Sequence, residues 1–205
     1  MSYWGWKKSA KECPKDMLED LEYYTDEAMN DLNTQGNTAS LGRFVFIKIK
    51  DQYYKLSEAR TGKDKHGFRH SVNYYVIHPI EASKVRESIR ELIYHEDGYK
   101  DSYSYEAPFT HADAMRLMEM GAIMAHERYN AYFKIEDGVM MDYWPEFDRE
   151  ENGYWDVFEA KNYQHSETLT EDNRYIGWRM AENYLEEEAE RKAIRAEYRK
   201  SKEAQ

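Results

Sequence analysis

The sequence predicts an α+β protein built from two helix–three-strand–helix units with antiparallel sheets, the second ending in a long helix. Stretches with apolar residues at three-to-four spacing are interspersed with shorter stretches in which apolar and polar residues alternate. These two patterns follow one another in the same order twice along the chain. Short turns separate the strands within each unit, which favours antiparallel pairing.

The first unit is expected to span residues 1–98. A helical pattern begins at Asp16 and ends near Asn33, where turn-forming residues follow. Pro79 is expected in the first turn of a second helix, because proline is tolerated there. The three strands of a basic β-meander between the helices are predicted at residues 43–50, 53–56 and 68–78.

The second, acidic unit is expected to span residues 110–205. A tyrosine-rich connection, residues 99–109, separates it from the first unit, unless the two form one fused domain. Thr110 and Asp113 have the spacing of an N-terminal cap pair, and the helical pattern after them continues to Tyr129.

The remaining elements of the second unit follow from turn signals and periodicity. Asp137-Gly138 lies between two apolar runs and is the strongest hairpin signal in the chain. A further strand is predicted over residues 154–163. The long final helix is expected to begin near Thr170.

Composition places the chain among folded, acidic proteins. The net charge is −11, and nineteen Tyr and five Trp argue against disorder. Apolar runs are far too short to span a bilayer, so no membrane association is expected. The first fifteen residues lack the apolar stretch of a secretory signal, and Cys13, the single cysteine, has no intramolecular partner. Together these features predict a cytoplasmic protein.

Nearly all of the net negative charge lies between residues 136 and 172. This segment contains twelve carboxylates but two basic residues, so its net charge is −10. Aromatic residues are interleaved with the acids. Such a segment attracts basic surfaces and repels phosphate if it faces outward. If it faces inward, its charges instead form part of the scaffold.

The leading hypothesis is a non-enzymatic protein that acts by binding. The sequence lacks a glycine-rich phosphate loop, a cysteine cluster and a Gly-x-Ser-x-Gly elbow. Small, acidic, Tyr-rich chains of this kind are similar in composition to anti-restriction and anti-CRISPR inhibitors carried by phages or mobile elements. That resemblance implies a surface that imitates phosphate charge and docks on a basic, nucleic-acid-handling protein. The residues expected to bind this partner are Tyr143, Trp144, Glu146, Asp148, Glu150, Glu151, Trp155 and Asp156.

The alternative is a metal-dependent nuclease. Asp142, on one predicted strand, is followed by Glu159-Ala160-Lys161 on the next. This pattern resembles the signature of PD-(D/E)xK nucleases, although the proline that precedes the family's aspartate is missing. The resemblance implies that Asp142 and Glu159 hold Mg²⁺ and that Lys161 helps to activate water. Without that activity, no cofactor is expected.

Direct binding of nucleic acid is not expected, because the chain as a whole is acidic. The region from Arg43 to Glu91 differs, with eleven basic and six acidic residues and several aromatics. Such strands can clamp single-stranded nucleic acid, but a sheet with one buried face has the same pattern. His66 and His70 lie in a predicted loop and strand, where their spacing does not form a zinc site.

Overall fold

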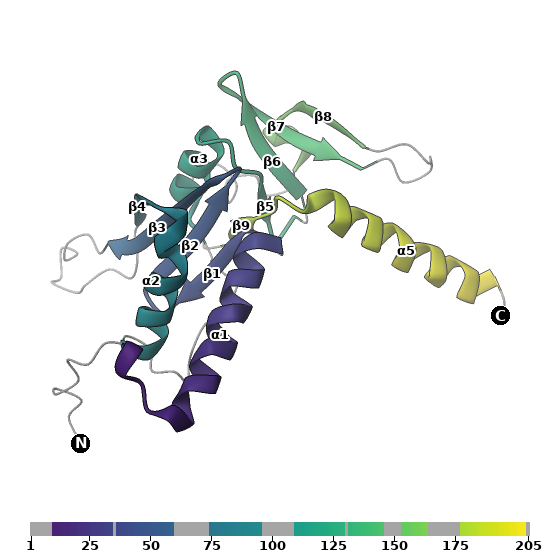
Figure 1. Cartoon of the computed structure of the whole chain (residues 1–205). Coiled ribbons are helices and arrows are strands. Elements are labelled where there is room, and N and C mark those ends of the chain that lie inside the picture. Colours follow the sequence, from purple (N-terminus) through teal and green to yellow (C-terminus); the bar gives the residue numbers. More distant parts are fainter. Residues whose placement is uncertain are drawn as a thin grey trace, which may run out of the picture.

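The computed structural model describes residues 10–34, 36–59, 74–95, 109–129, 131–145, 153–163 and 177–203. Its helices and strands form two antiparallel sheets with helices packed against them (Figure 1). The predicted α+β class is confirmed, with sheets of four and five strands and a long C-terminal helix.

The N-terminal unit consists of one sheet and the helices that cover it. Its elements are η1 (Ala10–Glu12), α1 (Lys15–Thr34), β1 (Thr38–Leu41), β2 (Phe44–Ile49), β3 (Gln52–Ala59), β4 (Tyr74–Ile80) and α2 (Ala82–His95). The strands lie in the order β1-β2-β3-β4. Figure 1 shows α1 and α2 side by side against this sheet. Strand β1 is an additional edge strand beside the three that the sequence predicts.

Side chains along β2 alternate between the two faces of the sheet, and each face packs in a different hydrophobic core. Phe46 packs on the helical side, where its neighbours include Leu21 of α1 and Ile89 of α2. Val45 and Ile47 point to the opposite face of the sheet, into a second core. Because both faces of the sheet are covered, β2 is apolar along most of its length.

The C-terminal unit contains the second sheet, whose order is β8-β7-β6-β5-β9. Its elements are α3 (His111–Glu119), β5 (Met124–His126), β6 (Ala131–Glu136), β7 (Val139–Trp144), β8 (Tyr154–Val157), η2 (Ala160–Asn162), β9 (Trp178–Met180) and α5 (Tyr184–Glu203). The Thr110 side chain accepts a hydrogen bond from the N–H of Asp113, as the cap spacing predicts. Asp137 and Gly138 form the predicted turn between β6 and β7, with φ of 51° and 77°.

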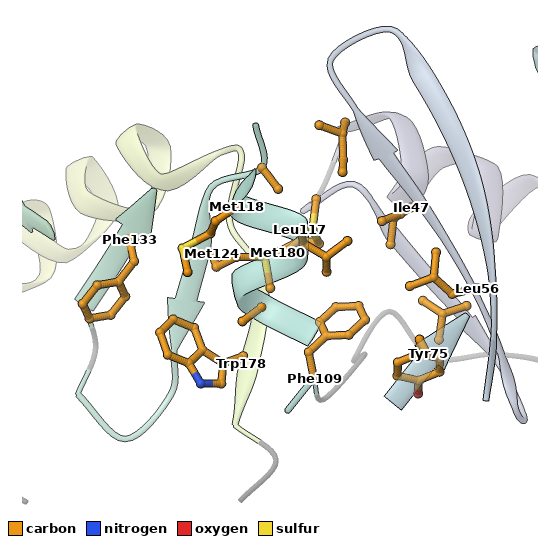
Figure 2. Packing of buried hydrophobic residues seen from close by; sticks show 14 of the residues in the cluster. Ile47, Leu56, Tyr75, Phe109, Leu117, Met118, Met124, Phe133, Trp178 and Met180 are labelled. Atoms are coloured by element: carbon orange, nitrogen blue, oxygen red, sulfur yellow. The ribbon is translucent and has the colours of Figure 1, made fainter. Parts of the chain in front are cut away.

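The two sheets share one hydrophobic core, shown in Figure 2. Ile47, Leu56 and Tyr75 from the first sheet pack in the same cluster as Leu117 of α3 and Trp178 of β9. Phe109 is fully buried there and is the described part of the connection predicted at residues 99–109. Figure 1 shows α5 leading away from the sheets, and every residue over 193–202 is exposed.

Two helix starts differ from the prediction. Pro79 lies in β4, not in a helix, and α2 begins at Ala82. Strand β4 is at the edge of its sheet, where the missing N–H of proline is tolerated. The last helix begins at Tyr184, and Trp178–Met180 before it forms β9.

Two predicted elements are too long. The helix expected to reach Tyr129 ends at Glu119, and Gly121 follows with φ of 97°, which a helix cannot contain. Its predicted continuation forms β5 instead. The strand predicted over residues 154–163 ends at Val157, before the 3-10 helix η2. Across the described residues, each helix is too short or too polar to cross a membrane.

Candidate functional site

Five of the twelve carboxylates between residues 136 and 172 belong to the described part of the chain. Four of them, Glu136, Asp137, Asp156 and Glu159, are exposed, whereas Asp142 is fully buried. The acids outside the described residues are Glu146, Asp148, Glu150, Glu151, Glu167, Glu171 and Asp172.

Two of the four exposed acids form ion pairs with lysines that lie within this segment or next to it in the sequence. Lys134 Nζ lies 2.8 Å from Glu136 Oε2, and Lys161 Nζ lies 2.6 Å from Glu159 Oε2. These pairs do not involve the basic residues of the N-terminal sheet. By contrast, Arg86 of α2 pairs with two acids of α1, so part of the acidic face of that helix is neutralised.

An aromatic and acidic surface lies on one face of the strand pair β7–β8. Trp144 lies directly opposite Tyr154, and Asp142 lies opposite Asp156. Residues two apart in a strand share a face, so all four side chains are on the same side of the sheet. Trp144 is 37% exposed and Tyr154 is 52% exposed. These four residues are named the β7–β8 patch below.

The other face of the same strands is covered by the start of α5. Tyr143 is buried, and its ring lies 5.0 Å from that of Tyr184. Trp155 is half-buried, and its indole N–H donates to the Tyr184 hydroxyl at 3.3 Å. Of the two expected partner-binding anchors on this face, Tyr143 is therefore buried beneath α5, and Trp155 is partly covered by it. Of the predicted aromatic anchors, Trp144 lies on the open face.

Asp142 is the buried member of the β7–β8 patch. Tyr163 donates a hydrogen bond of 2.8 Å to Oδ2, whereas Oδ1 is buried and accepts none from the described residues. Burial raises the pKa of Asp142, and the nearby charge of Asp156 acts in the same direction. Hydrogen bonds from Tyr163 and the Trp144 side chain oppose this pKa rise without cancelling it.

The arrangement required by the nuclease hypothesis is not formed in the described residues. Glu159 and Lys161 lie beyond the end of β8, at the start of η2 and within it, and their charged groups pair with each other at the surface. The Asp142 carboxyl is instead bound to Tyr163. Nor does the described part of the chain contain a group of three or more His, Cys, Asp or Glu side chains arranged to hold a metal ion.

A buried histidine–tryptophan cluster adjoins the patch and was missed by sequence reasoning. His126 of β5 is fully buried, and its ring meets that of Trp178 edge-on at 5.0 Å. Burial, with smaller effects from Arg128 and His111, lowers the pKa of His126 to about 4. A single histidine in a short apolar strand shows no sequence pattern that predicts its burial against a tryptophan. Tyr154, also missed, could have been found from its period-two relationship with Asp156.

Comparison of this chain with protein-family models, with curated proteins and with solved structures finds no match.

Proposed function

We propose that this protein is an acidic, non-enzymatic inhibitor or accessory protein that binds a basic, nucleic-acid-handling protein in the cytoplasm. The observation that carries the proposal is the exposed Trp144–Tyr154 pair beside the exposed carboxylate of Asp156. Aromatic side chains supply much of the binding energy at protein interfaces, and carboxylates select a basic partner.

The connection between β7 and β8 adds to the negative charge beside this pair. Its sequence contains Glu146, Asp148, Glu150 and Glu151 but one basic residue, Arg149. A surface with this charge competes with nucleic acid for a basic groove, as proteins carried by phages or mobile elements do when they imitate phosphate charge. Glu136 pairs with Lys134, and Glu159 pairs with Lys161, both at the surface. These local pairs support a segment that faces outward.

Affinity capture from a candidate host lysate tests this proposal. The immobilised protein should retain a basic protein at about 50 mM salt, and that protein should be released by high salt or by excess duplex DNA. The test variant neutralises five acids: Glu146→Gln, Asp148→Asn, Glu150→Gln, Glu151→Gln and Asp156→Asn. This variant should lose the captured protein.

A matched control has the same change in net charge but leaves the β7–β8 region intact. It carries Glu12→Gln, Glu19→Gln, Asp20→Asn, Asp51→Asn and Asp137→Asn, all at exposed positions. The control should retain the partner. Capture that resists high salt, or that survives in the test variant, would refute the proposed function.

A further inference from the structure

Helix α5 extends beyond the sheet on which it begins. In its first turn, the ring of Tyr184 lies 5.0 Å from that of Tyr143, and Glu187 accepts a hydrogen bond from Tyr132. Every residue over 193–202 is exposed, and Figure 1 shows this half of the helix leading away from the sheets. A helical stretch this short has little stability by itself in water, so it is expected to pack on a partner.

The protruding half of α5 carries two exposed apolar side chains on one side of the helix. Tyr184, Glu187 and Arg191, which contact the sheet, follow one another at spacings of three and four residues. The same spacing continues to Ile194 and Tyr198, which are 59% and 60% exposed. Residues at this spacing share one side of a helix, so these two extend the side that packs on the sheet. They are named the α5 seam below.

The sheet surface beside the start of α5 is also partly uncovered. Tyr143 and Trp155, which face α5, are directly paired across β7 and β8. Met141 and Val157 form the next pair on this face, and Val139 lies two residues before Met141. Both valines are exposed, and Met141 is half-buried. The three residues Val139, Met141 and Val157 are named the apolar strip below.

The two uncovered surfaces have opposite charge. Residues 193–202 contain four basic side chains and one acidic side chain, so their net charge is +3. The apolar strip belongs to the acidic part of the chain, where the exposed and described carboxylates are Glu136, Asp137, Asp156 and Glu159. The protruding half of α5 leads away from its own sheet, so the complementary surface has to come from another molecule.

We propose that a second copy of this chain covers both surfaces, in a symmetric dimer in which the α5 seam of each chain packs on the apolar strip of the other. Such a contact continues, between two chains, the packing that α5 begins on its own sheet. It occurs twice in the dimer, so each contact has to supply half of the roughly 1,200 Å² that a specific interface buries. The inference goes beyond the proposed function and does not rest on it, because the β7–β8 patch lies on the other face of these strands.

Sedimentation equilibrium of the full chain at about 5–100 μM and about 150 mM salt tests this dimer. Wild type should have the mass of two chains. Ile194→Glu should weaken the dimer at least tenfold, by roughly the cost of placing a charge in an apolar contact.

Ala196→Glu is the matched control for the helix. It adds the same charge at an exposed position two residues later, which is nearly the opposite side of the helix. Ala196→Glu should weaken the dimer less than about twofold. Neither position is buried in the single chain, so circular dichroism should show that both variants are folded.

A mixing experiment tests the sheet side of the contact. Val157→Lys, at an exposed position of the edge strand β8, places a positive charge opposite the basic half of α5 and should also weaken the dimer. An equimolar mixture of Ile194→Glu and Val157→Lys chains should dimerise again. In that pair one contact keeps Ile194 and Val157, and the other contact brings the new glutamate and the new lysine together.

Three results would overturn the dimer. One is a wild-type chain that stays monomeric over the whole concentration range. Another is equal weakening by Ile194→Glu and Ala196→Glu. The third is a mixture that stays monomeric, since this would show that the apolar strip does not receive the α5 seam. The capture experiment is independent of these results, so a monomeric wild type that still captures a basic protein leaves the proposed function standing.

Discussion

The backbone N–H of Tyr75 donates a hydrogen bond of 3.0 Å to Oδ1 of Asp113, which joins β4 of the first sheet to α3 of the second unit. Asp113 is buried, and its Oδ2 accepts a hydrogen bond from Thr110 at 2.9 Å. Arg116 completes the junction by donating to the carbonyl of Tyr75 at 2.7 Å. One carboxylate thus binds the N-cap residue of a helix and holds a neighbouring strand.

Replacing this carboxylate should destabilise the whole protein. Asp113→Ala leaves the N–H of Tyr75 and the hydroxyl of Thr110 without their acceptor, so we expect the free energy of unfolding to fall by roughly 2–4 kcal/mol. Urea denaturation followed by circular dichroism measures the change. Glu119→Ala, at an exposed position of the same helix, should have little effect. Equal losses of unfolding free energy in the two variants would contradict this role of the Asp113 carboxylate.

Gly153 is required where the chain enters β8. A Cβ atom there would overlap the carbonyl oxygen of Trp144 and lie 2.7 Å from the hydroxyl oxygen of Tyr143. Gly153→Ala should therefore lower the free energy of unfolding by about 1–3 kcal/mol through overpacking.

Gly138→Asn is the control for this substitution, since a Cβ at Gly138 has open space around it and asparagine tolerates positive φ. Gly138→Asn should lower the free energy of unfolding by about 1 kcal/mol or less. Denaturation curves for both variants, with tryptophan fluorescence as the probe, make the comparison. A well-tolerated Gly153→Ala would mean that β7 and β8 do not pack this closely.

His126 should make stability depend on pH in the mildly acidic range. Its pKa is lowered from 6.5 to about 4 in the folded protein, chiefly by burial. Between these values the unfolded chain binds a proton that the folded chain excludes, so stability should fall as pH drops from 6.5 towards 4. The loss that this group contributes is roughly 3 kcal/mol.

The pH effect can be assigned with two variants. His126→Phe keeps an aromatic ring against Trp178 and should flatten the dependence of unfolding free energy on pH between 4 and 6.5. His78→Gln, at an exposed position, should leave the dependence unchanged. The assignment is wrong if His126→Phe retains the wild-type slope.

Glu187 attaches α5 to the second sheet. Arg179 donates to its two carboxylate oxygens at 2.9 and 2.6 Å, and the hydroxyl of Tyr132 donates at 3.0 Å. Burial disfavours the charged form of Glu187, but the Arg179 hydrogen bonds outweigh this, so the pKa of Glu187 is lowered. Glu187→Gln should reduce the free energy of unfolding by roughly 1–3 kcal/mol.

The control for Glu187→Gln is Glu190→Gln, at an exposed position on the same helix. Glu190→Gln should change stability little. Thermal unfolding of both variants at pH 7 provides the measurement, and indistinguishable curves would show that the Arg179 contact does not stabilise the junction.

The Glu159–Lys161 pair should contribute little to stability or function. Its side chains are 51% and 75% exposed, so Lys161→Ala should change the free energy of unfolding by about 0.5 kcal/mol or less. The nuclease hypothesis instead requires Lys161 for cleavage. Mg²⁺-dependent DNA cleavage by wild type that is lost in Lys161→Ala would contradict the surface-pair interpretation.

Local sequence signals were sufficient for several elements of this fold. The Asp137-Gly138 turn and the Thr110–Asp113 cap depend on residues within one or two turns of each other, and both occur as predicted. The helical periodicity of α1 is likewise local. Short strands escaped prediction, because β5 and β9 have three residues each and are defined by pairing with each other, although 51 residues of chain separate His126 from Trp178.

The candidate site shows the same division between local pattern and tertiary packing. Period-two alternation by itself determined that Trp144 and Asp142 share one face of β7 while Tyr143 occupies the other. It could not determine which face would be covered. The tertiary structure decided this when Tyr184 of α5 packed on Tyr143 and left Trp144 open. Asp142 became buried for a comparable reason, because Tyr163, 21 residues later, returned to bind its carboxylate.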